Sequence, residues 1–310
     1  MTVDEKIKGS LYGFLIGDAL GIPYKANLSE KLVRLQKIDI LPPVKFNRSY
    51  KEIKPGTWSG NGAQMMCMLS SLAECKKFNV NNLANKLLSW YEKGYMSINQ
   101  KVFDVGHQTE ISLREYKNTR NPLTSGLVVK NGRGNASLSR ALPLGLFGTI
   151  TEDKIIEYSN IQSSITHADV APQICCALYT MWIKKISSGL SIKDAYEKSV
   201  DCLDEIYKNN ETYAYYFDKR LSPNDMNIHG KGTSYVLDSL RSVRDVVFKY
   251  DNYEDVVVNA VLLGNDTNST AALAGGIAGL YYGYESIPES WLGTLKGKSI
   301  VEKTLKDFMD

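Results

Sequence analysis

Cysteine is scarce in this 310-residue sequence, and the few cysteines present are not spaced as metal ligands or disulfide partners. Their number is odd, and no two form a Cys-x-x-Cys pair, so neither a disulfide framework nor a zinc site is indicated. The five are Cys67, Cys75, Cys175, Cys176 and Cys202. The adjacent Cys175 and Cys176 lack a neighbouring basic residue that would activate a thiolate. We expect reduced thiols in the core of a cytoplasmic protein.

Long hydrophobic runs are also missing. Asp18 interrupts the apolar stretch near the N-terminus, and the run from Ala271 to Gly283 is short and rich in glycine. A membrane-spanning helix needs about 20 consecutive apolar residues, and a secretory leader needs a longer apolar core than this. We therefore expect neither. The small residues between Ala271 and Gly283 instead predict a central helix that packs closely on its neighbours.

Neither sign of charge dominates, because 37 basic residues face 34 acidic ones and the net charge is only +3. A protein dedicated to nucleic acid carries a larger or more concentrated basic excess, so a nucleic-acid partner is not expected. Hydrophobic residues make up 43% and charged residues 23%, which is typical of a globular chain. We expect a single domain over residues 1–310.

The alternation of apolar and polar residues that marks β-strands is nearly absent. Apolar residues instead recur with the spacing of a helix, so we predict an all-α fold. The expected helices cover 5–20, 63–78, 82–94, 106–117, 136–149, 151–160, 169–188, 191–208, 232–249, 253–263, 268–283 and 298–308. Two polar segments, 26–57 and 210–231, lack this periodicity and are interpreted as irregular insertions or lids.

Four short stretches combine glycine with polar residues at the expected ends of helices. They are Gly17–Gly21, Gly56–Gly62, Gly134–Ser137 and Gly264–Ser269. Such a stretch is often only a helix cap. It also suits an anion site, because free backbone N–H groups at a helix start attract negative charge without a basic side chain.

Taken together and in order, six segments of the sequence resemble the motifs of the ADP-ribosylglycohydrolase family. They are GSLYGFLIGDALGIPY (9–24), GTWSGNGAQM (56–65), FDVGHQT (103–109), GNASLSRALPLGLF (134–147), SSITHAD (163–169) and LLGNDTNSTAALAGGIAGLYYG (262–283). The resemblance implies an all-α, single-domain helical bundle with a central cleft that holds two magnesium ions. It also implies cleavage of the bond between ADP-ribose and an acceptor such as an arginine or serine side chain.

The positions that the resemblance assigns to metal binding are mostly substituted. Three of them fall on Ser59, Gly60 and Asn61, and three more fall on Asp266, Asn268 and Ser269. The position of a supporting glutamate carries Lys25. Five carboxylates in the family pattern are thus reduced to Asp266 alone, and an ammonium is added.

This change of charge argues against magnesium, which binds through carboxylates, water and phosphates. Like charges a few ångströms apart repel by about 4 kcal/mol per pair at an effective dielectric near 20, so Lys25 would oppose a nearby metal ion. We expect no metal cofactor, and we expect Lys25 to point into the cleft beside Asp266. There it can take the place of a cation and bind a diphosphate or a ribose hydroxyl. Alternatively, Lys25 is a solvated surface lysine and Asp266 caps a helix.

Other motif positions are retained, and each has a structural alternative. Under the resemblance, the loop of Gly134, Asn135, Ala136 and Ser137 cradles a diphosphate, although it can also be a plain cap. Asp18 and His107 occupy polar family positions, and His167 follows Thr166 at a helix start. Asp169 either lies in the first turn of that helix or contacts the ligand. Tyr235 either stacks on adenine or is a core tyrosine. Ser59, Asn61, Asn268 and Ser269 complete the expected ligand site.

Three functions remain open. The first is a protein that binds ADP-ribose, an ADP-ribose-derived small molecule or an ADP-ribosylated protein without hydrolysing it. The second is an active hydrolase with a reduced or metal-free mechanism, in which Asp266 is the catalytic base and Lys25 stabilises charge. The third is a structural protein that reuses the fold, as crystallins of this family do.

Overall fold

The computed structural model describes residues 2–128 and 133–310, and within them the chain is helical, with isolated bridges in place of strands. The elements that begin before residue 165 are α1 (Val3–Gly21), η1 (Ile22–Tyr24), α2 (Ser29–Leu32), α3 (Gly60–Cys75), α4 (Val80–Lys93), η2 (Ile98–Gln100), α5 (His107–Thr119), α6 (Ala136–Ser139), α7 (Leu142–Leu146) and α8 (Glu152–Ser164). They are followed by α9 (Val170–Ser187), α10 (Ile192–Tyr207), α11 (Glu211–Tyr215), a π-helical turn η3 (Tyr216–Leu221), α12 (Val236–Lys249), α13 (Tyr253–Leu262), α14 (Thr267–Tyr282), η4 (Tyr284–Ser286), α15 (Glu289–Thr294) and α16 (Lys298–Met309). The predicted all-α fold class is confirmed.

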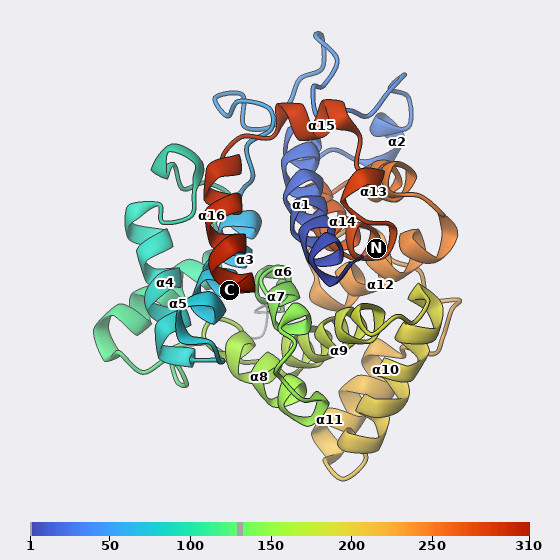
Figure 1. Ribbon diagram of the computed structural model, residues 1–310. Coiled ribbons are helices and arrows are strands. Elements are labelled where there is room, and N and C mark those ends of the chain that lie inside the picture. The colour runs from blue at the N-terminus through green and yellow to red at the C-terminus, as the bar shows by residue number, and fades with distance from the viewer. Residues whose placement is uncertain (1, 129–132) are drawn as a thin grey trace.

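Helices α1 and α14 lie side by side at the centre of the molecule (Figure 1) and touch backbone to backbone. Their contact face carries glycines at intervals of four residues, including Gly9, Gly13 and Gly17 on α1. A Cβ atom added to Gly17 would lie 2.1 Å from the carbonyl oxygen of Ala271, and one added to Gly9 would lie 2.3 Å from that of Gly279. No side chain fits between the two helices. The close packing that the small residues of α14 predicted is therefore confirmed.

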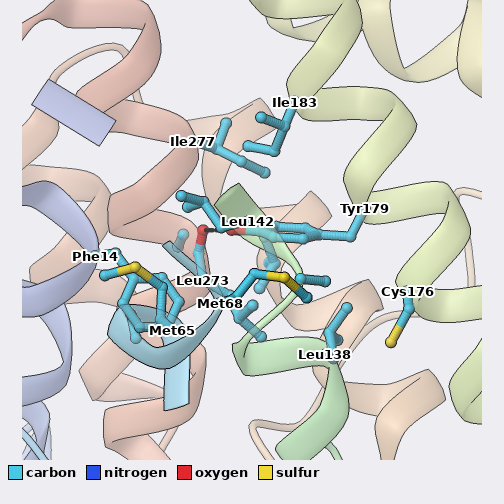
Figure 2. Close-up of a cluster of buried hydrophobic side chains, with 14 of the residues drawn as sticks. Phe14, Met65, Met68, Leu138, Leu142, Cys176, Tyr179, Ile183, Leu273 and Ile277 are labelled. Atoms are coloured by element: carbon cyan, nitrogen blue, oxygen red, sulfur yellow. Dashed lines mark hydrogen bonds between the residues drawn. The ribbon is translucent and has the colours of Figure 1, made fainter. Parts of the chain in front are cut away.

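A second layer of apolar side chains surrounds this pair. Figure 2 shows Phe14 of α1 and Ile277 of α14 in one cluster with side chains of α3, α6, α7 and α9. The buried Tyr179 on α9 donates a hydrogen bond of 2.9 Å from its hydroxyl to the carbonyl oxygen of Leu273 on α14. A polar contact therefore ties α9 to the central pair. All five cysteines are free, and Cys67, Cys175 and Cys176 are buried, in agreement with the expected core thiols.

Most predicted helices are confirmed to within a few residues, but the predicted helix 136–149 is wrong. The structure divides it into α6 and α7, with Arg140 and Ala141 between them. Pro143 in the first turn of α7 has no N–H group, so it cannot continue the hydrogen-bond ladder of α6. The break leaves α6 with only four residues.

The two irregular segments differ from each other. Segment 26–57 is largely irregular, as expected, and contains only the short α2; its loops lie at the top of Figure 1. Segment 210–231 is more ordered than predicted, because α11 and the turn η3 occupy its first half. None of the helices within the described residues is both long and apolar enough to cross a membrane.

The close contact of α1 and α14 makes a prediction for stability. We expect Gly17→Ala to lower the free energy of unfolding by about 3 kcal/mol, because its Cβ would overlap the Ala271 carbonyl and force the helices apart. Urea denaturation measures this change. Gly293→Ala in α15 is the matched control, since a Cβ there meets nothing within 4 Å, and it should be neutral or slightly stabilising. Equal effects of the two variants would contradict the prediction.

Candidate functional site

The site forms where the C-terminal end of α1 meets the N-terminal ends of α3 and α14. At its base lies Asp18, a buried aspartate with four hydrogen-bond donors around it. Its carboxylate accepts from the backbone N–H of Ser59 (2.8 Å) and of Gly62 (2.9 Å). It also accepts from the Ser59 hydroxyl at 2.7 Å and the Asn268 side-chain amide at 3.0 Å. Burial raises the pKa of Asp18 to about 6, although these hydrogen bonds oppose the rise.

Lys25 follows η1 and extends its side chain into the site. Its Nζ lies 2.8 Å from Asp104 Oδ2, 2.8 Å from Asp266 Oδ1 and 2.9 Å from Asn268 Oδ1. Burial alone would lower the pKa of Lys25, but the carboxylates of Asp266 and Asp104 outweigh it and raise the pKa above its ordinary value. The expected position of Lys25 beside Asp266 is confirmed, and the alternative of a solvated surface lysine is wrong.

The three partners also change the expected role of Lys25. An ammonium has three hydrogens, and here each has an oxygen within hydrogen-bond distance. No hydrogen is left for a diphosphate or a ribose hydroxyl, so Lys25 does not act as a ligand-binding group in this arrangement. It neutralises and orients the carboxylates around it.

Asp104 is the residue that the sequence analysis missed. It lies in the FDVGHQT segment, from which the sequence analysis named His107 instead. Its backbone is left-handed, with φ of 56°. Its Oδ1 accepts a hydrogen bond of 2.9 Å from the Tyr50 hydroxyl, and its Oδ2 accepts one of 3.0 Å from the Asn268 amide. Asp104 is the only acidic residue of that segment, and its carboxylate is the feature by which the sequence could have indicated a site residue. The site therefore holds three carboxylates, those of Asp18, Asp104 and Asp266, rather than one.

Asp266 occupies the N-cap position of α14, as the structural alternative expected, but its side chain makes no capping hydrogen bond there. One oxygen contacts Lys25, and the other accepts a hydrogen bond of 2.8 Å from the Asn135 side-chain amide. Burial favours the neutral acid, yet Lys25 and the hydrogen bonds hold the pKa of Asp266 below its ordinary value. Asp266 is thus a weakly basic carboxylate with both oxygens occupied.

These side chains are a poor fit for a pair of magnesium ions. Ser59 contacts Asp18, and Asn61 donates its side-chain amide to the Ser269 hydroxyl at 2.9 Å. The carboxylates of Asp104 and Asp266 share the Lys25 ammonium. Among the described residues, no group of three or more histidine, cysteine, aspartate or glutamate side chains is arranged to hold a metal ion. A divalent ion would have to displace Lys25 first.

Above this base lies a cleft of about 730 Å³. Nine of the residues expected in the site line it: Lys25, Asn61, His107, Gly134, Asn135, Ala136, His167, Asp266 and Ser269. Thr233, Ser234 and Gln108, which the sequence analysis did not name, line it as well. The combination of backbone, amide, hydroxyl and imidazole groups suits a polar ligand with many hydrogen-bonding atoms.

Other expected residues lie beneath or beside the cleft. Asp18, Ser59 and Asn268 form its base. The side chain of Ser137 is directed into the core, where its Oγ lies 2.9 Å from that of Ser163, so only its backbone is left for the expected diphosphate loop. Tyr235 is not among the lining residues. Its backbone forms an isolated bridge with Gly134, so it positions that loop.

His167 lies on the wall of the cleft near Gly134, and Asp169 follows it in the chain without lining the cleft. His167 is almost fully buried, and burial, followed by the charge of Arg140, lowers its pKa to about 3. It is therefore neutral at physiological pH. Asp169 caps α9 by accepting from the Ala171 N–H at 3.0 Å, and it also pairs with the Arg133 guanidinium at 3.1 Å. Asp169 is thus the N-cap residue of α9 and lies just before the first turn in which it was expected.

Segment 26–57 runs along the Lys25 end of the cleft. Its first residues bond to the loop before α14, since the Ala26 N–H donates to the Asn265 carbonyl at 2.7 Å. Farther along, the Ser49 hydroxyl donates to the Lys25 carbonyl at 2.5 Å, and Tyr50 reaches Asp104. This segment therefore closes one side of the site, as the interpretation of a lid anticipated.

A larger hollow of about 1030 Å³ lies elsewhere, between α3, α4 and α16. It contains none of the motif residues, and its wall includes Lys86, which already pairs with Glu74 at 2.7 Å. Size alone therefore does not identify the functional site.

Comparison with known proteins agrees with the motifs. A family model described as ADP-ribosylglycohydrolase matches residues 1–310. The ADP-ribosylarginine hydrolase Tri1 of Serratia proteamaculans (strain 568) is 28% identical over 94% of this chain and 75% of its own length. The ADP-ribosyl-[dinitrogen reductase] glycohydrolase of Rhodospirillum rubrum is 23% identical over 100% of this chain and 96% of its own. A solved structure titled ADP-ribosylglycohydrolase-related protein complex has a TM-score of 0.76 at 20% identity, covers 99% of this chain and 97% of its own, and supports the fold alone.

The raised pKa of Asp18 makes a prediction for the pH dependence of stability. An acid whose pKa rises on folding stabilises the folded state below its unfolded pKa, and this stabilisation is lost as the pH rises through the folded value. The window therefore runs from about pH 4 to about pH 6. We expect the unfolding free energy of the wild type, relative to Asp18→Asn, to fall across it by up to about 3 kcal/mol. Denaturation of both proteins at several pH values measures the difference, and a constant difference would contradict the prediction.

Proposed function

Because this chain belongs to the ADP-ribosylglycohydrolase family, we propose that it binds ADP-ribose or an ADP-ribose-derived nucleotide in a cleft where the Lys25 ammonium takes the place of metal ions. One observation carries the proposal. The Nζ of Lys25 lies within 2.9 Å of oxygen atoms on Asp104, Asp266 and Asn268. A positive charge is thus already provided by the chain itself.

The substitutions around this ammonium are consistent with one another. Asn268 accepts from Lys25 through its amide oxygen and donates through its nitrogen to Asp18, Ser59 and Asp104. An aspartate at position 268 would add a third charge beside Asp18 and Asp104 and could donate nothing to them. The amide therefore suits a site held together by hydrogen bonds, whereas a carboxylate suits one held together by metal ions.

Ligand binding is assigned to the polar groups other than Lys25 that line the cleft. At the inner end, the carboxylates of Asp104 and Asp266 and the side chains of Asn61 and Ser269 are suited to ribose hydroxyls. Toward the outside, the backbone of Gly134–Ala136 and the side chains of His167, Thr233 and Ser234 surround the space in which a diphosphate would lie. The excess of carboxylates at the inner end favours the placement of the diphosphate away from it.

Hydrolysis is expected to be weak. Asp266 has both oxygens occupied and a lowered pKa, so it is a poor general base. Asp104 is similarly held by Lys25, Asn268 and Tyr50. A binding or sequestering role for the free nucleotide or for an ADP-ribosylated protein therefore fits the site better than turnover. Hydrolysis by a metal-free mechanism is the second candidate, and the relatives' names favour hydrolysis as such.

Calorimetry with ADP-ribose tests the proposed function directly. We expect binding of similar affinity in the presence of magnesium and of a chelator, because the cation of the site is covalently part of the chain. Turnover of an ADP-ribosylated arginine substrate should stay far below that of a metal-dependent relative assayed in parallel. No binding at millimolar ADP-ribose would refute the proposal, and so would binding or hydrolysis that requires magnesium.

Removing the ammonium should convert the site into a weak metal site. In Lys25→Met, the carboxylates of Asp104 and Asp266 lose their shared cation, so we expect magnesium affinity to rise at least tenfold, as measured by calorimetry. Lys231→Met is the matched control, because Lys231 is an exposed lysine beside the cleft loop and its ammonium pairs with no carboxylate among the described residues. Equal magnesium affinity in both variants and the wild type would show that Lys25 does not occupy the place of a cation.

Once Lys25 is replaced, further carboxylates should raise the magnesium affinity more, and positions 61 and 268 can accept them. Asn61→Asp and Asn268→Asp in the Lys25→Glu background increase the negative charge without filling space. Gly60 is not suited to the same change, because a Cβ there would lie 2.9 Å from the Trp90 ring and 3.0 Å from the Asp104 carbonyl oxygen. Restoration of the full family pattern is thus blocked by packing as well as by charge.

A further inference from the structure

Beneath the cleft wall lies a buried arginine without any carboxylate partner among the described residues. Arg140 is fully buried between α6 and α7. Its Nε donates to Gln162 Oε1 at 2.8 Å, and its Nη1 donates to Gln64 Oε1 at 3.0 Å. Its Nη2 donates to the Gln162 carbonyl at 2.7 Å and to Thr166 Oγ1 at 2.9 Å. A guanidinium can only donate, so every one of these oxygens must accept.

This requirement determines the direction of the next hydrogen bond. Thr166 Oγ1 lies 2.8 Å from Nδ1 of His167. The Thr166 oxygen already accepts from Arg140, and Nδ1 is the only acceptor among the described residues within reach of its single hydrogen, so we assign that hydrogen to Nδ1. A neutral imidazole that accepts at Nδ1 carries its hydrogen on Nε2. Burial and the charge of Arg140 also keep the ring neutral.

The other end of the imidazole faces the cleft. His167 is one of the lining residues, and a Cβ added to Gly134 would lie 3.4 Å from its Nε2. Within residues 2–128 and 133–310, Nε2 has no hydrogen-bond partner. Helix α6, with four residues, has too short a run of aligned peptides to provide a strong N-terminal dipole. The imidazole of His167 is therefore a side-chain group on this wall that can donate in addition to the Gly134–Ala136 backbone.

We propose that Arg140 and Thr166 are positioning residues that fix His167 as a neutral Nε2–H donor toward an acceptor oxygen of the ligand. The ligand part of this inference rests on the proposed function, and the tautomer part does not. Arg140 touches no ligand and acts through Thr166. The acceptor is a phosphate or hydroxyl oxygen of the nucleotide, since both accept a hydrogen bond from a neutral donor.

The tautomer is measured on the protein without ligand, by nitrogen NMR of the imidazole rings. The chain has only three histidines, so His107→Asn and His229→Asn identify the His167 signals. We expect a pyridine-like Nδ1 and a protonated, pyrrole-like Nε2. A protonated Nδ1 in the wild type would overturn the proposal, whether or not the protein binds ADP-ribose.

Thr166→Val tests the relay, because it removes the hydroxyl and retains the size of the side chain. We expect the Nδ1–H tautomer to become populated and the affinity for ADP-ribose to fall about tenfold, the loss of one hydrogen bond. Thr166→Ser restores the hydroxyl and should keep both properties. Thr109→Val is the matched control, since Thr109 is a buried threonine whose hydroxyl has no partner among the described residues. It should leave the tautomer and the affinity unchanged.

The outcomes separate this inference from the proposed function. The expected wild-type tautomer with no ADP-ribose binding would refute the proposed function and leave the relay in place. A changed tautomer in Thr166→Val with unchanged affinity would show that the ligand does not use the Nε2–H group, and would overturn the inference while ADP-ribose binding stood. If Thr166→Val fails to fold, the wild-type spectrum and the comparison with Thr166→Ser still decide the direction of the Thr166 hydrogen bond.

Discussion

The contact of α1 with α14 without intervening side chains is the constraint on which the rest of the structure depends. The two helices touch through glycine and alanine along their full length, and the contact continues to Gly21, where an added Cβ would lie 2.4 Å from the Asn268 Cα atom. This closeness brings Asp18, at the end of one helix, to the start of the other. With a larger side chain at any of these glycines, the hydrogen bond from Asn268 to Asp18 would be lost together with the packing.

The carboxylates of the site have their partners within the chain. Those of Asp104 and Asp266 contact the Lys25 ammonium, Asp18 has neutral donors alone, and each of the three accepts hydrogen bonds from neutral groups. Asp18 depends on the Ser59 and Gly62 backbone, Asp266 on Asn135, and Asp104 on Tyr50 and Asn268. A buried carboxylate is stable only when its oxygens are hydrogen-bonded or paired. The amides and hydroxyls that replace metal ligands here are the groups that satisfy this need.

The wall of the cleft is also organised around a cation, the guanidinium of Arg140. Arg140 has no counter-charge within the described residues, and its hydrogen bonds instead end on amide, carbonyl and hydroxyl oxygens. In both places a cation determines which neighbouring groups accept and which donate; Arg140 is fully buried, and Lys25 is partly buried at the base of the cleft. Lys25 does so for the base of the cleft, and Arg140 does so for the imidazole of His167. The site is thus organised by two internal cations, each provided by a side chain.

The sequence by itself determined the helical class, most helix positions, the family and the substituted metal positions, because these depend on local periodicity and on ordered motifs. It also indicated that Lys25 lies beside Asp266. Only the tertiary structure decided the direction of each hydrogen bond. The inward rotation of Ser137, the break between α6 and α7, and the approach of Tyr50 and Asp104 to Lys25 all arise from contacts between segments far apart in the chain. Asp104 was overlooked because a single aspartate in a loop has no periodic pattern. Its role appears only when folding places it 2.8 Å from an ammonium that lies 79 residues earlier in the sequence.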